Sequence, residues 1–362
     1  MPNINYAQQW APELLDILIQ GSMISPFITT NVKWLGAKTF HFTQMSTSGY
    51  KSHNRNGGWN RGNFVQADVP FTLMHDRDVE FCVDRLDVDE SNATASIKNI
   101  SETFARTQSV PESNALFFSR CATKAKTLAG YHSETAISAY TVDNVYSKLK
   151  SFISAGHLRR YRAMGALVMY VRSDIMDLLE RSKELQRKIE LTQIAEGGMG
   201  IETRVTSIDG VPIFEVIDDE VFYDSFDFES KDGGFVPAEA SDAVYELTSD
   251  IAVDSSKTYY TRSGSEGSYT YSAVKSPAVG SISTYYEMTK PAVEGSKKIN
   301  VLIASPLTTK FVPKLSSIYY FAPGGHTQGD CYLYQNRAFS DVFTFPNGKD
   351  NKIDSLYVDV ES

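Results

Sequence analysis

The densest group of side chains that could do chemistry lies between Asp218 and Glu229. Its carboxylates are Asp218, Asp219, Glu220, Asp224, Asp227 and Glu229. Carboxylate oxygens are the ligands that Ca²⁺ and Mg²⁺ prefer in proteins. The segment lacks the Asp-x-Asp-x-Asp-Gly spacing of a calcium-binding loop. We interpret it as a solvated acidic loop, with metal binding as the alternative.

Catalytic motifs are missing from the sequence. It has no GxSxG, HExxH or GxxxxGK[ST] pattern, and no two of its 6 histidines stand four residues apart. The glycines of Gly197–Gly200 follow a predicted helix, whereas a dinucleotide-binding loop follows a strand. The sequence therefore predicts a protein that is not an enzyme and has no catalytic residue, no cofactor and no resident metal.

Three cysteines, Cys82, Cys121 and Cys331, stand far apart and form no CxxC pair. Extracellular disulfide frameworks use several cysteines at close spacing. The spacing therefore predicts reduced thiols. Cys82 and Cys121 each lie within an apolar pattern, so both are predicted to be small core residues.

The charge distribution bears on nucleic-acid binding. The segment His157–Arg162 mixes arginine with tyrosine, as single-strand binders do, but it would equally suit the carboxylates of a neighbouring subunit. The formal net charge is −9. A protein whose main task is to grip phosphate presents a clustered basic surface instead. We therefore expect no sequence-specific binding of nucleic acid.

Composition and length describe a soluble globular chain. Its 362 residues are 42% hydrophobic and 22% charged, which allows one large or two modest cores. The N-terminal sequence has neither the basic nor the apolar region of a signal peptide. No apolar run approaches the roughly 18 residues that cross a membrane. We expect a protein without membrane association, made in a cytoplasm.

A long hairpin pattern organises the first part of the chain. The outgoing arm carries Phe40 and Phe42, and the returning arm carries Val69, Phe71, Leu73, Val79, Phe81 and Val83. The returning residues share one parity and would line one face of a strand. Between the arms, Ser46–Asn63 is rich in Gly, Asn and Ser and includes Lys51, Arg55 and Arg61. A tip of this composition cannot bury itself against its own chain.

A long helix pattern follows the hairpin. The acidic run Asp84–Ser91 is expected to cap it, because acidic groups are stabilised at a helix N-terminus. Ala93, Ile97, Ile100 and Phe104 then predict a helix with one narrow apolar stripe. Pro111 is expected to interrupt this helix, because proline donates no backbone hydrogen bond. A second helical run would continue to Leu128.

Strand patterns dominate the rest of the chain. Residues 166–171 and 300–304 are continuous apolar runs, typical of strands buried on both faces. Asp209-Gly210 predicts the two-residue turn of a β-hairpin. Residues 244–288 alternate Tyr, Thr, Ser and Val, which predicts a small inserted β-module over 236–292.

The order of these elements resembles a known family. The sequence VDRLDVDES from Val83, followed by ETFARTQSVPESNALFFSRCA from Glu102, resembles the major capsid protein of tailed bacteriophages, which has the Hong Kong 97 capsid fold. The sequence VTSIDGVPIFEV from Val205 is similar to the axial-domain hairpin of that family. Arg337 and Asp341 match an Arg followed four residues later by Asp, which is common in the family's closing strands.

The resemblance implies an α+β fold of the Hong Kong 97 type with distinct parts. These are an N-terminal arm (1–32), an extended β-hairpin loop (33–83), a peripheral domain with the spine helix (84–135 and 321–362), an axial domain (136–235 and 293–320) and the inserted β-module (236–292).

It also implies a function and partners. Copies of the chain would form hexamers and pentamers of an icosahedral shell that encloses double-stranded DNA, in a virion with a portal protein, after synthesis in the host bacterial cytoplasm. Many members carry an N-terminal scaffolding segment for which this chain has no room, so a separate scaffolding protein or none is expected. Decoration proteins are further possible partners. The alternative is a phage surface binding protein whose β-module recognises a glycan or a host receptor.

Charged residues then define a candidate contact between copies. We expect the tip cations Lys51, Arg55 and Arg61 of one copy to rest on acidic residues of the next, namely Asp84, Asp87, Asp89 and Glu90. Some family members also crosslink a hairpin lysine to a neighbour's asparagine. The resemblance makes Lys51 and either Asn347 or Asn351 the residues for such a bond here.

Overall fold

A computed structural model describes most of the chain. The described residues are 14, 17–18, 21–30, 32–53, 59–90, 96–182, 207–229, 234–247, 257–265, 269–274, 285–290, 292, 294–347 and 352–362. The chain divides into two compact units. Unit 1 comprises Met1–Phe235 and Lys297–Ser362, and unit 2 comprises Val236–Ser296.

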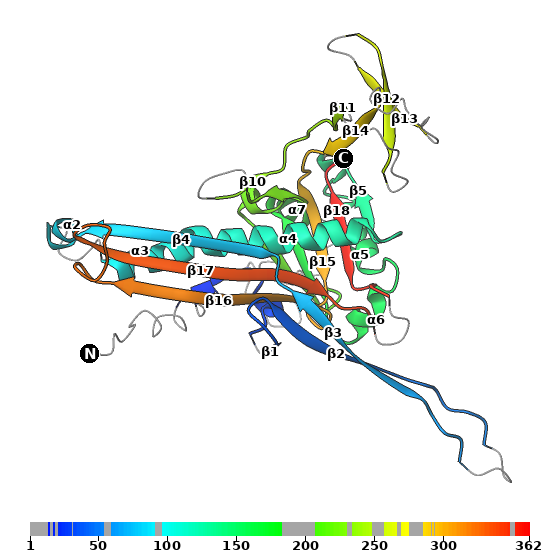
Figure 1. The fold of residues 1–362 in the computed structure, drawn as a ribbon. Coiled ribbons are helices and arrows are strands. Elements are labelled where there is room, and N and C mark those ends of the chain that lie inside the picture. Colours follow the sequence, from blue (N-terminus) through cyan, green and yellow to red (C-terminus); the bar gives the residue numbers. More distant parts are fainter. Residues whose placement is uncertain are drawn as a thin grey trace. The chain divides into compact units, whose positions relative to one another are not determined.

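Unit 1 is built on a six-stranded mixed sheet (Figure 1). Its strand order is β5 (His132–Glu134), β18 (Leu356–Val360), β15 (Ile299–Ala304), β6 (Val168–Arg172), β8 (Val211–Val216) and β7 (Ser207–Ile208). Every residue of β6, β15 and β18 is buried. The two predicted fully buried strands are therefore confirmed.

Helices cover both faces of this sheet. Tyr170 and Leu302 belong to the cluster that includes Phe117 and Phe118 of α4 (Val110–Lys126). Their neighbours Met169 and Ile303 point the other way, into a cluster with helices α5 (Val145–Ile153), α6 (Leu158–Ala163) and α7 (Ser173–Glu180). This alternation follows from the two-residue period of a strand. It explains why these strands carry no solvent-facing polar positions.

A buried carboxylate ties the sheet to the segment after the spine. Asp359 is fully buried, and its oxygens accept hydrogen bonds from Ser133, Thr135 (2.7 Å), Tyr140 (2.5 Å) and Asn300 (2.9 Å). Burial, together with the adjacent Asp359 charge, raises the pKa of the Tyr140 phenol. Because a buried charge is tolerated only when it is fully hydrogen-bonded, these donors are needed to keep Asp359 in the sheet.

The β7–β8 turn has the predicted form. Asp209 and Gly210 have φ values of 52° and 79°, so both occupy the left-handed region that the two-residue hairpin turn requires. The predicted helix that precedes Gly197–Gly200 is described as α7, which ends at Glu180, and residues 183–206 lie outside the described residues.

The spine is helical from Ile97 to Lys126, and the predicted interruption at Pro111 is wrong. It consists of α3 (Ile97–Phe104), a π-helical turn η3 (Ala105–Ser109) and α4. In η3 the amide of Val110 donates to the carbonyl of Ala105, five residues back. This wider turn places Pro111 in the first turn of α4, where no amide donor is needed. Across the described residues, no helix is long and apolar enough to cross a membrane.

The acidic run does not cap the spine as predicted. It forms a separate short helix, α2 (Arg85–Glu90), whose Leu86 amide donates to the Asp84 carboxylate at 2.8 Å. The spine begins later, with Ser96 as N-cap accepting from the Asn99 amide. The acidic run therefore caps the N-terminus of α2 and not that of the spine.

A second sheet of unit 1 packs on the first half of the spine. Its order is β16 (Thr309–Phe321), β17 (Cys331–Thr344) and β4 (His75–Asp84). Phe81 of β4 contacts Phe104 of the spine, with ring centroids 5.4 Å apart. Glu112 of α4 accepts from His75 at 2.8 Å and pairs with Arg77 at 2.9 Å. These contacts fix β4 to the spine.

The hairpin is shorter than predicted, because the returning arm breaks into two strands. The hairpin pairs β2 (Thr39–Thr47) with β3 (Phe64–Thr72), and β1 (Lys33–Trp34) adds a short edge. Leu73 is buried beside Phe40, whereas Met74 is 72% exposed, and β4 then joins β17. The apolar residues of one parity therefore divide between two sheets, which a regular two-residue period cannot reveal.

Ion pairs hold the base of the hairpin to the second sheet. Asp76 of β4 accepts from Lys38 at 2.6 Å and from both ends of the Arg337 guanidinium at 2.9 and 2.7 Å. The Arg337 hydrogen bonds, and secondarily Lys38, lower the pKa of Asp76 to about 2. The other member of the predicted pair, Asp341, accepts from the Met74 amide at 3.1 Å. Arg337 and Asp341 thus both fix the hairpin base, through different partners.

The predicted reduced state of the cysteines is wrong for two of the three. Cys82 of β4 and Cys331 of β17 form a disulfide, with Cα atoms 5.8 Å apart. Cys82 is exposed, because it has the opposite parity to Phe81 and Val83, which face the spine. Cys121 of α4 is a buried free thiol, as predicted.

The N-terminal segment contacts the same core. Leu14 and Leu18 are buried against the spine region. Ser25–Phe27 forms a 3₁₀ turn, η2, with Phe27 fully buried, and Ile28 bridges Phe311 of β16. Shorter elements of unit 1 are η4 (Ile137–Ala139), η5 (Asp219–Val221) and β9 (Phe226–Asp227).

Unit 2 contains β10 (Val236–Pro237) and a four-stranded antiparallel sheet. The order of that sheet is β11 (Val244–Leu247), β14 (Tyr286–Lys290), β12 (Tyr259–Ser263) and β13 (Thr270–Val274). Tyr245 of β11 stacks on Tyr271 of β13 with centroids 3.9 Å apart, although two strands separate them in the sheet. The sheet is therefore strongly curled around its tyrosines.

Replacing Asp359 with asparagine should destabilise unit 1. The amide would lose the charge and present donors to groups that already donate, so we expect the free energy of unfolding to fall by about 3 kcal/mol. Urea denaturation of the Asp359→Asn variant measures the change. The control is Asp177→Asn, an exposed partner of Arg181, which should cost about 0.5 kcal/mol or less. A similarly small effect at Asp359 would contradict this account.

The Asp76 ion pairs should stabilise the fold in a pH-dependent manner. The folded-state pKa is depressed from 3.8 to about 2, so the contribution is present above pH 4 and is lost as the pH falls toward 2. Because Arg337 is half exposed, we expect about 1 kcal/mol, with roughly half lost by pH 3. The measurement is the difference in unfolding free energy between wild type and Asp76→Asn at pH 7, 5 and 3. A difference that does not shrink between pH 5 and 3 would refute the assignment.

Candidate functional site

The tip of the β2–β3 hairpin is the first candidate site. Its two arms are held together by Lys51, whose ammonium donates to the Arg61 carbonyl at 3.0 Å, and by Asn60, whose amide donates to the Ser52 carbonyl at 2.7 Å. Every described residue of 47–53 and 59–64 is exposed. Arg55 lies outside the described residues.

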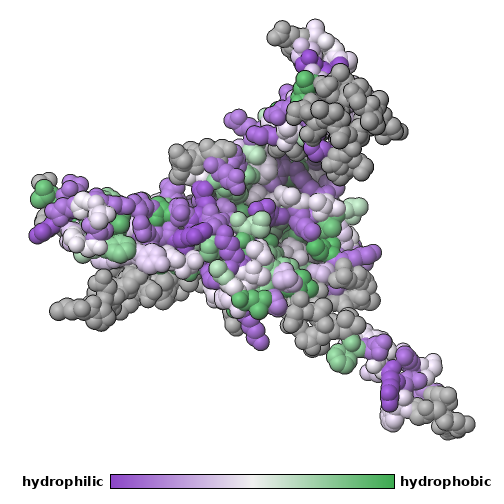
Figure 2. Space-filling model, viewed as in Figure 1, coloured by the Kyte–Doolittle hydropathy of each residue, from purple (hydrophilic) through white to green (hydrophobic). Residues whose placement is uncertain are grey.

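Aromatic rings on this tip face solvent. Trp59 is 94% exposed and Phe64 is 73% exposed, and Tyr50 is also fully exposed. Figure 2 shows the described tip residues as mainly hydrophilic or neutral in hydropathy. Large rings that are exposed beside cations mark a surface for a partner, because their burial would be favourable.

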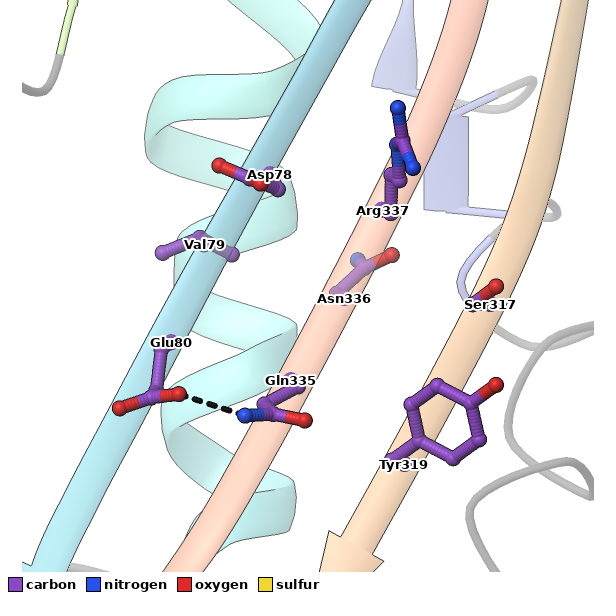
Figure 3. Close-up of a pocket in the computed structure, with 8 residues that line it drawn as sticks. All are labelled: Asp78, Val79, Glu80, Ser317, Tyr319, Gln335, Asn336 and Arg337. Atoms are coloured by element: carbon purple, nitrogen blue, oxygen red, sulfur yellow. Dashed lines mark hydrogen bonds between the residues drawn. The ribbon is translucent and has the colours of Figure 1, made fainter.

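The second candidate is the outer face of the β16–β17–β4 sheet, opposite the spine. A groove of about 480 Å³ crosses this face (Figure 3). Asp78 and Glu80 lie on β4, Arg337 and Gln335 on β17, and Ser317 and Tyr319 on β16. The Gln335 amide donates to Glu80 at 2.6 Å.

Acidic side chains dominate the β4 side of this groove. We call Asp76, Asp78, Glu80 and Asp84 the acidic row, since they occupy alternate positions of one strand. No nucleophile and base are paired among the residues lining the groove, so its chemistry is that of polar and ionic recognition. It fits a ligand surface that carries cations and hydrogen-bond donors.

The predicted contact residues fall into two groups within the structure. Asp84 ends the acidic row and Asp87 lies in α2, and both are exposed. The side chains of Asp89 and Glu90 lie outside the description. Lys51 and Arg61 lie at the hairpin tip, with Lys51 bonded inside the tip. The contact predicted between the tip of one copy and the acidic residues of the next therefore stays a prediction.

The acidic segment Asp218–Glu229 is used in ion pairs. Asp224 is buried and pairs with Lys126 of the spine, and it accepts from the Lys297 amide at 2.7 Å. Asp219 pairs with Lys298 at 3.2 Å, and Asp218 caps η5. Within the described part of the chain, no group of His, Cys, Asp and Glu residues is arranged to hold a metal.

Part of the basic segment His157–Arg162 forms ion pairs within its own unit. Arg160 and His157 lie 3.7 and 3.8 Å from Asp354, and Arg162 lies 3.6 Å from Asp209. Neither sequence-based alternative, a neighbour's carboxylates or nucleic acid, anticipated these partners. The Gly197–Gly200 loop lies outside the described residues.

The residues proposed for a crosslink are only partly described. The Asn347 side chain donates to Asp354 at 2.8 Å, so it already has a partner in its own chain. Asn351 lies outside the described residues. A crosslink to Lys51 stays a prediction.

Sequence reasoning missed the acidic row and the Asp76 ion pairs. The signal was present in the segment DRDVEFCVD, where acidic residues alternate with Val and Phe. The apolar parity was used to predict one buried face, whereas the opposite parity carries the acidic row.

No family model matches the chain, and no curated protein matches its sequence. Among solved structures, it is similar to the mature capsid of bacteriophage PhiM1, with 13% identity, a TM-score of 0.51 and coverage of 94% of this chain and 87% of that one. It also matches the capsid of cyanophage P-SCSP1u, with 11% identity, a TM-score of 0.47 and coverage of 92% and 86%.

The likeness to the PhiM1 capsid extends over 94% of this chain. Structural similarity at this level of sequence identity shows the fold alone. The chain has the α+β capsid fold of the Hong Kong 97 type, as its sequence predicted.

Proposed function

We propose that this chain is the major capsid protein of a tailed bacteriophage, which self-assembles into an icosahedral shell around double-stranded DNA. The observation that carries the proposal is the fully exposed hairpin tip on a capsid fold, with Trp59 94% exposed. The alternative of a glycan-binding or receptor-binding protein is not favoured, because the likeness to a capsid covers 94% of the chain.

A two-stranded ribbon is marginally stable in water, and the described tip residues bury none of their side chains within the chain. A neighbouring copy can cover those surfaces. In a closed symmetric shell each such contact repeats many times, so individually weak contacts become strong together.

Further proposals concern the partners of the chain and the roles of its segments. The chain would form hexamers and pentamers in the virion, joined by a portal protein and by separate scaffolding and decoration proteins where these exist, after synthesis in the bacterial cytoplasm. Residues 1–32 would be the N-terminal arm. Of the predicted loop 33–83, the part up to Thr72 would form the extended loop, since β4 belongs to the second sheet. Residues 84–135 and 321–362 would form the peripheral domain, 136–235 and 293–320 the axial domain, and 236–292 an inserted module.

We also propose which charges meet between copies. The tip cations Lys51, Arg55 and Arg61 would lie on Asp84, Asp87, Asp89 and Glu90 of the neighbour. Support comes from exposure, since Lys51, Arg61, Asp84 and Asp87 all face solvent in the isolated chain. Opposite charges on two surfaces accelerate their encounter and fix their register.

Expression of the chain should give closed shells or rings of capsomers, visible by negative-stain electron microscopy and as large particles in light scattering. A monodisperse folded monomer at high concentration, with circular dichroism showing native helix and strand, would refute the capsid proposal.

Reversing the tip charges should block assembly without unfolding the chain. In the variant Lys51→Glu, Arg55→Glu, Arg61→Glu, acidic groups would face acidic groups, and we expect the assembled fraction in sedimentation to fall at least about tenfold. The control Lys51→Arg, Arg55→Lys, Arg61→Lys keeps the charge and should assemble.

Adding Asp84→Lys and Asp87→Lys to the reversed chain tests the pairing itself. If the tip meets these acids, the compensating changes should restore part of the assembly. Normal shells from the charge-reversed variant would refute the contact, while the capsid proposal would stand on the microscopy.

A further inference from the structure

The disulfide between Cys82 and Cys331 joins two sulfurs with different access to solvent. It links residues 249 apart in the sequence, at the end of the second sheet near α2. Cys82 is exposed on the outer face of the edge strand β4, whereas Cys331 of the central strand β17 is 5% exposed. The third cysteine, Cys121, is fully buried in the core beside the six-stranded sheet.

We propose that Cys82 is a modification site for small thiols and disulfides, and that the Cys82–Cys331 disulfide opens and closes through it. Thiol–disulfide exchange requires a thiolate to approach one sulfur along the bond, so access decides which sulfur is attacked. The exposed Cys82 can be approached from solvent, whereas Cys331 is only 5% exposed.

The exchange balances in two steps. A small thiolate attacks Cys82 Sγ, the Sγ–Sγ bond breaks, and its electron pair leaves on Cys331 Sγ, which takes up a proton. A second thiolate then attacks the small-molecule sulfur of the mixed disulfide and releases Cys82 as a thiol. In total, two small thiols and the protein disulfide give one small disulfide and two protein thiols. Closure is the reverse, with the small disulfide as oxidant.

Local charge determines which small thiols react well. Glu80 and Asp84 lie two residues to either side of Cys82 on the same face of β4, and Asp84 pairs in register with Cys331. Asp330, also exposed, precedes Cys331. Arg85, the next residue after Asp84, offsets part of this charge. The remaining negative field disfavours anionic thiols and favours cationic ones, because residues two apart in a strand have Cα atoms only about 7 Å apart.

Opening the disulfide would release a constraint but leave the sheet paired. The backbone ladder between β4 and β17 runs from Asp84–Cys331 to His75–Ser340, and the Asp76–Arg337 ion pairs lie at its other end. We therefore expect the reduced chain to keep its fold and to lose stability mainly at the α2 end. The inference needs only the folded chain and is independent of assembly.

Thiol counting on the full wild-type chain tests the disulfide first. After denaturation, neutral 4,4′-dithiodipyridine should detect Cys121 alone, and after prior reduction it should detect all three cysteines. The protein for this test is purified without reductant and exposed to the disulfide cystamine. If three reactive thiols are then found before reduction, the proposal is overturned.

Two matched variants test which sulfur is reactive. Cys331→Ser leaves Cys82 as the free thiol, and Cys82→Ser leaves Cys331, while Cys121 reports unfolding in both by becoming reactive. Under native conditions, Cys82 should react with dithiodipyridine at least about tenfold faster than Cys331. Equal rates, or a faster Cys331, would overturn the assignment.

Peptide mapping of the wild type keeps the test valid if a variant unfolds. Brief treatment with cysteamine, followed by acid quenching, should place the mixed disulfide on Cys82. A mixed disulfide found on Cys331 would overturn the assignment.

The charge effect has its own readout. The rates of opening by cysteamine and by glutathione, each per thiolate present, are divided by the rate with the neutral thiol 2-mercaptoethanol. The quantity compared is the normalised cysteamine rate divided by the normalised glutathione rate. The ratio should favour cysteamine about tenfold at low ionic strength and approach one in 0.5 M salt. The double variant Glu80→Gln, Asp84→Asn should lower the ratio. A ratio near one in the wild type at low salt would overturn the electrostatic part.

Discussion

Burial of the spine between two sheets is the interaction on which unit 1 depends. Phe117 and Phe118 of α4 close one face of a sheet whose inner strands have no solvated side. The other half of the same rod packs its Phe104 against Phe81 of the second sheet. Because one helix serves both cores, neither sheet can shift along it without breaking apolar contacts in the other.

Contacts with the spine fix the position of the hairpin base. Glu112 contacts His75 and Arg77 at the start of β4. Where the chain turns from β3 into β4, the Asp341 carboxylate accepts a hydrogen bond from the Met74 amide. Arg337 and Lys38 then fix Asp76. The exposed tip therefore projects from an anchored base, which is what a contact with another copy requires, since a loose arm would lose more conformational entropy on binding.

The sequence predicted those elements whose pattern reflects a single local cause. Residues 166–171 and 300–304 are strands because continuous apolar runs need cover on two faces, and Asp209-Gly210 is a turn because both residues tolerate positive φ. The prediction at Pro111 was wrong. A π-helical turn lets the helix continue past a proline that donates no backbone hydrogen bond, but only where tertiary packing stabilises the spine. The Cys82–Cys331 bond and the Asp76–Arg337 ion pair were missed because each joins residues about 250 positions apart. Pairing at that distance depends on sheet order, and no local pattern encodes it.

One parity of β4 connects the features of the second sheet. The inward residues Val79, Phe81 and Val83 face the spine side, so the outward positions are free to carry Asp76, Asp78, Glu80, Cys82 and Asp84. On an edge strand, such charges oppose unwanted pairing with other strands. The same charges bind Arg337 at one end and surround the disulfide at the other. An acidic edge therefore protects the sheet, anchors the hairpin and sets the electrostatic environment of Cys82, and a substitution that neutralises the row would alter all three together.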